Sequence, residues 1–338
     1  MSKKTRNRAG RAGTAAAADS TASASAGPNP RQPCPCGSGK RYKACHGAGD
    51  DVIVLRPFEG LASECDLVAM REFVPSGYAP LPLSAEGKKL AGDRTSVRIA
   101  SVLPGASAAM VREDTSVLVG MQTQTRTGDL SGDLARALRW SFTAEPGEAL
   151  PVSGASLGDG PVRLQDLLDP EATLDVTVAK DFAWWMPPGP DGSPGQPPAE
   201  MAAALEHANN AIMPTEAVRG TDDSLRGAYW VDAGEKAHLR WVRPEQEDRL
   251  LAALARLSAA NELSLGDGSK YVGAFRAHGL LIPVWDLDRE MHVKEWNAPV
   301  EALGTRLNDT LAALDEKPLT DAERRARDAI TGRQVTLR

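Results

Sequence analysis

The chain has 338 residues, of which 42% are hydrophobic and 25% charged, and its formal net charge is −6. This is the composition of a globular protein with one large or two medium domains. No run is apolar enough to span a membrane, and the Ala-rich stretch 14–26 contains Asp19 and lacks Leu, Ile, Val and Phe, so it cannot be the apolar core of a signal peptide. A cytoplasmic location is therefore expected.

Residues 1–32 are expected to form a disordered basic arm, because they combine Ala, Ser, Gly and basic residues with few large apolar side chains. Residues 1–47 carry nine Lys or Arg and one acid, Asp19, a net charge of +8, so the rest of the chain carries −14. Such an arm can bind the phosphate groups of a nucleic acid, fold onto the acidic body or stay solvated. The sequence leaves these three roles open.

Residues 33–48 form a cysteine-rich segment in which Cys34, Cys36, Cys45 and His46 have the spacing C-x-C-x8-C-H. So short a segment buries no core and costs about 1.5 kcal/mol per residue to order. A structural zinc ion in a short peptide contributes roughly 10 to 16 kcal/mol. Three thiolates and one imidazole fill the four tetrahedral positions of Zn²⁺ and leave none for a substrate. The segment is therefore predicted to be a structural zinc knuckle.

A disulfide or simple burial is the alternative interpretation of the cysteines. Cysteines two positions apart strain a mutual bridge, the chain has only four cysteines, and nothing marks it for export, which favours metal binding. Cys65, outside the segment, is expected to be a small buried apolar residue. Lys40, Arg41 and Lys43 lie close enough in sequence to offset the negative charge of the zinc site, and they are candidates for partner binding.

The run from Cys34 to Gly47, CPCGSGKRYKACHG, resembles the SEC-C motif. This zinc knuckle is found at the tail of the SecA translocation ATPase and on many otherwise unrelated bacterial proteins. Carried over position by position, the resemblance makes Cys34, Cys36, Cys45 and His46 the zinc ligands. In SecA the knuckle docks a chaperone and is implicated in ribosome contact, so the resemblance implies a protein or ribosomal partner. The rest of the chain is similar in layout to an uncharacterised family of SEC-C-bearing proteins from high-GC bacteria.

The body after the knuckle is predicted to be an α+β fold built from a duplicated β-hairpin and helix unit. Asp66–Phe73 matches Asp175–Phe182 at an offset of 109, and Asp133–Leu138 matches Asp248–Ala253 at an offset of 115. A shorter match, between 102–104 and 212–214, lies between them. The expected parts are a first repeat at 50–186, a Pro/Gly loop at 187–198, a second repeat with a related hairpin and helix at 199–318, and a C-terminal surface helix and tail at 319–338.

Alternating apolar and polar residues over 228–242, with a turn at 233–236, predict a β-hairpin. A helix should follow with Pro244 in its first turn, because leucines recur at helical spacing at Leu250, Leu251, Leu254 and Leu257. The segment 284–296 echoes the first hairpin, with tryptophans again eleven residues apart, so a second hairpin is expected there. Its helix would carry Pro299, Leu303, Leu307, Leu311 and Leu314. A last surface helix is predicted over about 321–330, with Thr320 as its cap.

The body offers few further candidates for function. Its tryptophans are expected to pack in the core and on sheet faces, although the Trp184–Trp185 pair, predicted to lie in a strand, would expose one ring as a partner contact. His238 and His292 are predicted to be exposed strand residues, and Asp286 and Asp288 are predicted to cap a turn.

The motifs G-x-S-x-G and H-E-x-x-H do not occur, and Arg41 stands where a phosphate-binding loop needs Ser or Thr. We therefore expect a zinc-binding, noncatalytic adaptor that docks on a protein or ribosomal partner through its knuckle. Nucleic-acid binding through residues 1–47, above all RNA, is the first alternative, and an enzyme with its site in the duplicated body is the second.

Overall fold

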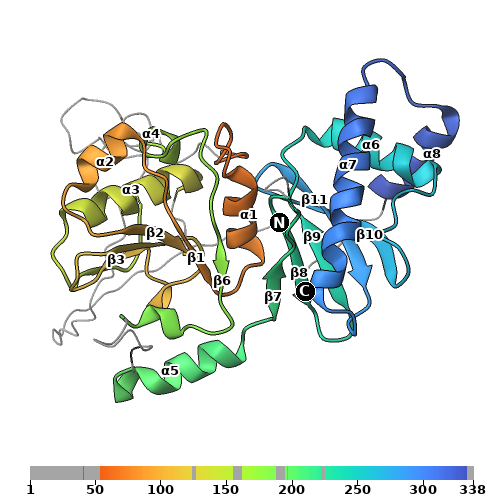
Figure 1. The fold of residues 1–338 in the computed structure, drawn as a ribbon. Coiled ribbons are helices and arrows are strands. Elements are labelled where there is room, and N and C mark those ends of the chain that lie inside the picture. The colour runs from red at the N-terminus through yellow and green to blue at the C-terminus, as the bar shows by residue number, and fades with distance from the viewer. Residues whose placement is uncertain are drawn as a thin grey trace, which may run out of the picture. The chain divides into compact units, whose positions relative to one another are not determined.

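The structure is a computed structural model that describes residues 54–123, 127–154, 162–187, 197–221 and 225–332, together with Arg41 and Gly195. The chain divides into two units, Met1–Asp51 and Val52–Arg338. The predicted arm, the predicted knuckle and most of the predicted Pro/Gly loop lie outside the described residues, apart from Arg41. The described part of the second unit contains helices and two β-sheets, so the α+β prediction is confirmed (Figure 1). Among its helices, none has the length and apolar character needed to cross a bilayer.

The first sheet has six strands in the order β5-β3-β4-β2-β1-β6. Its neighbours pair antiparallel except β2 and β4, which are parallel. All residues of the central β4 are buried. Its sequence is a continuous apolar run, as expected for a strand that is covered on both faces. The strands are β1 (Gly77–Pro80), β2 (Val97–Ala100), β3 (Ala109–Val111), β4 (Val117–Gly120), β5 (Ala149–Leu150) and β6 (Thr177–Val178).

Three helices lie over one face of this sheet: α2 (Ala85–Ala91), α3 (Leu130–Thr143) and α4 (Leu164–Leu167) (Figure 1). The side chain of Asp129 caps α3 by accepting the Gly132 N–H at 3.0 Å. Leucines at 130, 134 and 138 share one side of α3 and are buried against the sheet. Two further helices, α1 (Glu64–Glu72) and α5 (Ala199–Asn210), precede and follow these elements in the chain.

The second sheet has five antiparallel strands in the order β10-β11-β9-β8-β7. The predicted hairpin at 228–242 is confirmed: β8 and β9 pair from Ala228 opposite Trp241 to Asp232 opposite Ala237. The strands are β7 (Thr215–Ala217), β8 (Ala228–Asp232), β9 (Ala237–Trp241), β10 (Ser269–Ala277) and β11 (Leu280–Leu287).

Three helices share a hydrophobic cluster with the second sheet: α6 (Glu247–Ala259), α7 (Asn297–Ala313) and α8 (Asp321–Thr331). The predicted apolar faces of α6 and α7 are buried, apart from Leu314, which follows α7 and is only partly buried. Pro244 lies before α6 instead of in its first turn. The predicted cap of α8 is also confirmed, because Thr320 and Glu323 form a capping box. This helix is mostly exposed, but its Ile330 is buried in the hydrophobic cluster that contains the apolar faces of α6 and α7.

The second predicted hairpin, at 284–296, is wrong. Strand β11 ends at Leu287, its hairpin partner is the preceding β10, and residues Val293–Trp296 form a 3₁₀ helix (η6). His292 explains the difference, because its Nδ1 accepts the Lys294 N–H at 3.2 Å while the Glu295 carboxylate accepts the His292 N–H at 2.8 Å. This capping pattern favours a helical turn over a returning strand.

The segments matched in the predicted duplication differ in structure. Asp66–Phe73 lies in and just after α1, whereas Asp175–Phe182 contains the short β6 and a turn. Asp133–Leu138 and Asp248–Ala253 are both helical, in α3 and α6. The two sheets also have different strand orders. The duplication and its boundaries therefore stay a prediction.

Helix α1 lies between the two sheets (Figure 1). One hydrophobic cluster joins residues of α1 and of the first sheet to Tyr229, Val242, Leu280 and Ile282 of the second sheet or its edge. A separate cluster covers the opposite face of the second sheet with side chains of α6 and α7. The second sheet is thus buried on both faces, and α1 contributes to covering one of them.

Gly227, just before β8, is a point of close approach between the second sheet and α1. Its N–H donates to Asp66 Oδ1 at 3.2 Å. Its φ is +67°, and a Cβ at this position would lie 2.9 Å from Cys65 Cβ and 3.0 Å from the Val242 carbonyl oxygen. Only glycine combines this backbone conformation with this spacing.

Gly227→Ala should lower the free energy of unfolding by roughly 3 kcal/mol, because the new methyl group meets α1 and the positive φ becomes strained. The matched control is Gly234→Ala in the β8–β9 turn, where φ is +93° and no atom lies within 4 Å of the new Cβ. That variant should lose only about 1 kcal/mol, from backbone strain alone. Urea unfolding of both variants measures the difference, and equal losses would contradict the close approach.

Candidate functional site

The predicted zinc ligands Cys34, Cys36, Cys45 and His46 lie outside the described residues, as do Lys40 and Lys43. Arg41 is described and exposed. Within the described ranges, no three His, Cys, Asp or Glu side chains are grouped so that they could hold a metal ion. The donor set at 34–46, three sulfurs and one imidazole nitrogen, is the chemistry that Zn²⁺ prefers, so these residues fit the ion by type.

Cys65 in α1 behaves as predicted. It is a free thiol, 6% exposed, within the hydrophobic cluster that joins α1 to both sheets. Burial raises the pKa of its thiol well above the usual value, so the side chain stays protonated and unreactive.

The packing role predicted for the tryptophans is confirmed for Trp241, Trp285 and Trp296, which are at most 1% exposed. The expected strand at Trp184–Trp185 is wrong, because these residues lie in a 3₁₀ turn. The Asp181 side chain initiates this turn by accepting the Ala183 N–H at 2.9 Å.

Both indole N–H groups of this pair are occupied within the protein. Trp184 donates to Ser76 Oγ at 2.8 Å, and Trp185 donates to the Val102 carbonyl at 3.0 Å. The Trp185 ring also stacks on Phe182, with a centroid distance of 4.4 Å. The pair therefore fastens its turn to the first sheet.

A polar cluster links β9 and β11 on one face of the second sheet. His238 and Asp286 are register partners, and His238 Nδ1 lies 3.2 Å from Asp286 Oδ1. Lys236 forms an ion pair with the other oxygen of Asp286. Asp286 is therefore a cross-strand partner and does not cap a turn as predicted, whereas Asp288 does, by accepting the Glu290 N–H at 2.9 Å.

The prediction that His238 and His292 are exposed strand residues is also wrong in part for each. His238 lies in a strand but its side chain is only 23% exposed, and His292 is exposed but begins a helical turn. Burial lowers the pKa of His238, and the opposing effect of Asp286 is smaller. His238 is thus a neutral imidazole at pH 7.

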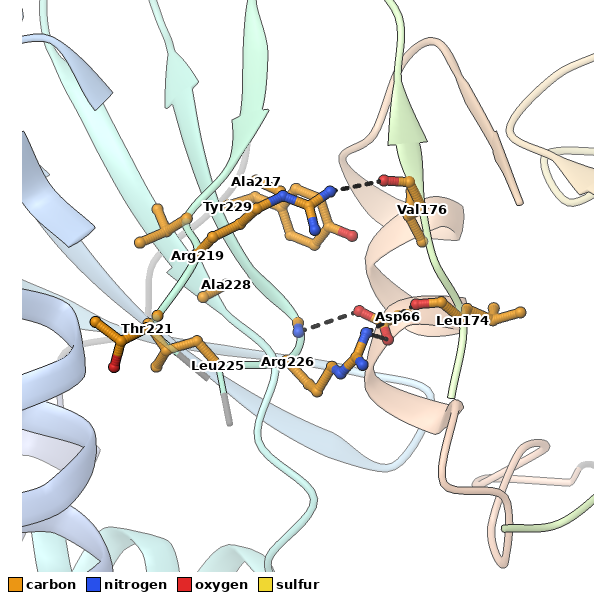
Figure 2. Close-up of a pocket in the computed structure, with 13 residues that line it drawn as sticks. Asp66, Leu174, Val176, Ala217, Arg219, Thr221, Leu225, Arg226, Ala228 and Tyr229 are labelled. Carbon is orange, nitrogen blue, oxygen red and sulfur yellow. Dashed lines mark hydrogen bonds and ion pairs between the residues drawn. The ribbon is translucent and has the colours of Figure 1, made fainter. Parts of the chain in front are cut away.

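A cavity of about 300 Å³ lies where α1, the segment before β6, the segment after β7 and the start of β8 meet (Figure 2). Nothing in the sequence pattern predicted it, although Arg-Gly occurs at 219–220 and again at 226–227, on either side of it. The lining residues with polar side chains are Asp66, Arg219, Thr221, Arg226 and Tyr229.

The floor of this cavity is a buried carboxylate with its partners. Asp66 is 4% exposed, accepts the Gly227 N–H, and lies 4.0 Å from Arg226 Nη1. Arg226 in turn donates to the Leu174 carbonyl at 2.9 Å and to Thr173 Oγ1 at 3.0 Å. The guanidinium therefore joins α1 and β8 to the segment that leads into β6.

The rim is formed by Arg219 and Thr221. Arg219 Nη2 donates to the Val176 carbonyl over a long 3.4 Å. The same nitrogen lies 4.0 Å from the carboxylate of Asp175. The backbone of the segment is held more firmly, since the Arg219 N–H donates to Asn297 Oδ1 at 3.2 Å and the Thr221 N–H to Glu301 Oε1 at 3.0 Å. Two guanidinium groups, a carboxylate, a phenol and a hydroxyl thus converge here, a set suited to binding a polar ligand.

Two family models match the chain. Residues 57–338 match a family of unknown function, DUF5926, and residues 31–48 match the SEC-C motif. The second match includes the whole predicted knuckle, so the resemblance to SEC-C-bearing proteins is confirmed. No curated protein and no solved structure gives a significant match.

His238→Gln should flatten the pH dependence of stability between about pH 7 and pH 5. The unfolded histidine takes up a proton near pH 6.5, while the folded one resists it because its pKa is lowered, so wild-type stability falls as the pH drops through this window. One such group contributes a slope of at most roughly 1.4 kcal/mol per pH unit. Urea unfolding at several pH values tests this, with the exposed His292→Gln as control. Identical slopes for wild type and His238→Gln would contradict the assignment.

Proposed function

We propose that this chain, which belongs to the family of unknown function DUF5926 and carries a SEC-C motif ahead of the family's body, is a zinc-binding adaptor without catalytic activity. The SEC-C match at residues 31–48 is the observation that carries the proposal. The adaptor docks on a protein or ribosomal partner through the knuckle, and it works in the cytoplasm, where its thiols stay reduced.

Zinc has a structural role in this proposal. Cys34, Cys36, Cys45 and His46 hold the ion, and the ion supplies the free energy that orders a segment too short for a core of its own. Since all four positions are taken by the protein, the site recognises a partner through its shape and not through an open metal position. Three thiolates leave the bound site with a net charge of −1, which Lys40, Arg41 and Lys43 offset.

The basic residues also suggest how the knuckle contacts its partner. Lys40, Arg41 and Lys43 fall between the second and third cysteine ligands, so ordering the ligands also restricts these side chains. Fixed cations lose less conformational entropy on binding than cations on a flexible chain. In this proposal the zinc ion therefore strengthens partner binding without touching the partner.

Full-length wild-type protein, purified under reducing conditions, should contain one equivalent of zinc. Cys45→Ser and Cys36→Ser should each lose most of it, because each removes one of the four ligands that close the tetrahedral site and hold the segment ordered. Elemental analysis of the undenatured protein measures the content. Cys65→Ala is the matched control and should keep its zinc, because Cys65 is buried in the body. A wild type with far less than one equivalent, or a Cys45→Ser protein that keeps its zinc, would refute the site.

Affinity purification from the native cell should recover a protein or ribosomal partner with the wild type and lose it with Cys45→Ser. A triple variant with alanine at positions 40, 41 and 43 should keep the zinc but weaken capture, which separates the cations from the metal. The circular dichroism spectrum of each variant confirms that the body is folded. Partner sets that are the same for the wild type and Cys45→Ser would count against docking through the knuckle.

RNA binding is the second candidate, and the +8 charge of residues 1–47 is the observation that favours it. Ribonuclease treatment before the purification distinguishes the two. A partner that remains after treatment supports protein docking, and one that is released only by ribonuclease, with capture that falls steeply with salt, supports RNA binding instead.

A further inference from the structure

The cavity of Figure 2 has the size of a small-molecule site and a fixed rim. Its volume of about 300 Å³ lies at the lower end of the range for ligand pockets. The backbone of Arg219 and Thr221 is tied to Asn297 and Glu301 of α7, so the rim is in place before a ligand arrives. Such preorganisation lowers the entropic cost of binding.

Arg219 brings more hydrogen-bond donors to the cavity than the described residues use. A guanidinium has five N–H donors in a planar fork. In the described structure, the Arg219 side chain makes one hydrogen bond, the 3.4 Å contact with the Val176 carbonyl. The Arg219 side chain is 60% exposed, and Asp175, whose carboxylate lies 4.0 Å from it, is 87% exposed, so water largely screens that pair.

Tyr229 brings a second donor without a partner. Its side chain is 2% exposed, and its hydroxyl makes no hydrogen bond to any described residue. Figure 2 shows the hydroxyl directed into the cavity, on the side where the Arg219 guanidinium lies. Burial raises the pKa of this phenol, so it remains an O–H donor at neutral pH. A buried hydroxyl without a partner is costly unless a ligand or water accepts from it.

Among the described residues that line the cavity, the charges leave one cation in excess. The carboxylate of Asp66 is balanced by Arg226 at 4.0 Å and accepts the Gly227 N–H. Arg219 has no comparable buried counter-charge among the described residues. A group that accepts several hydrogen bonds and carries negative charge would therefore satisfy both Arg219 and Tyr229.

We propose that this cavity binds the oxyanion group, a carboxylate or a phosphate, of a small metabolite. The Arg219 fork donates two parallel N–H bonds to its oxygens, the geometry that guanidinium groups favour with such anions. The Tyr229 hydroxyl donates to the same group from the cavity wall, and Arg226 keeps its contacts with Leu174 and Thr173. This binding is independent of the knuckle and would give the body a ligand of its own.

The test uses the full-length protein at constant ionic strength, adjusted with sodium chloride, and titrates it with inorganic phosphate or with malonate. Calorimetry and the thermal unfolding midpoint should show saturable binding in at least one of the two titrations. Tighter binding of phosphate supports a phosphorylated metabolite, and tighter binding of malonate supports a carboxylate ligand.

Three variants locate the binding. Arg219→Met should weaken it at least roughly tenfold, since a charge-assisted pair is lost. Tyr229→Phe should weaken it roughly threefold or more without lowering the unfolding midpoint of the ligand-free protein, because the ring keeps its contact with Phe73 and no described residue accepts from the lost hydroxyl. Arg289→Met is the control, because Arg289 is similarly exposed and pairs with Asp232.

The control should bind as the wild type does. The proposal is overturned if neither anion binds saturably, if Arg219→Met and Tyr229→Phe bind as tightly as the wild type, or if Arg289→Met weakens binding as much as Arg219→Met.

Discussion

The body depends on one buried carboxylate, that of Asp66, which α1 carries between the two sheets. A carboxylate that is 4% exposed is tolerated only when donors and a cation compensate for its lost hydration. The Gly227 N–H and the Arg226 guanidinium meet this need, and both belong to the start of β8. The charge of Asp66 therefore helps to fix where the second sheet meets α1, together with the 2.8 Å contact between Glu72 Oε1 and His278 Nε2. These polar contacts have a directionality that apolar packing against Tyr229 and Val242 does not have.

The same requirement creates the cavity. Because Arg226 must reach both Asp66 and the Leu174 carbonyl, the start of β8 is held beside the segment that leads into β6. The polar partners keep these elements from closing into an apolar contact, and the space between them is lined by hydrogen-bonding groups. The proposed oxyanion site thus follows from the way the two sheets are joined, since one arginine is used for joining and the other, Arg219, keeps donors that no described residue uses.

The sequence predicted what depends on neighbouring residues. Alternation fixed the β8–β9 hairpin, leucine spacing fixed the buried faces of α6 and α7, and Thr320 fixed the start of α8. Prediction failed where one side chain changes the local structure: His292 begins a helical turn in place of a strand, and Asp181 turns the Trp184–Trp185 segment out of a strand. The cavity could not be predicted from the sequence, because Asp66 and Gly227 are 161 positions apart and no sequence periodicity indicates their contact. The proposed zinc ligands are the opposite case, since one short segment contains all four.

The two proposed recognition sites draw their stability from different sources. The clusters that form the core of the described body contain residues from Phe58 to Ile330. A change at Asp66 or Gly227 acts on the junction that also builds the cavity. An adaptor built in this way can be tested one part at a time: a knuckle variant that still binds an oxyanion has a folded body, so its loss of a partner is assigned to the knuckle and not to misfolding.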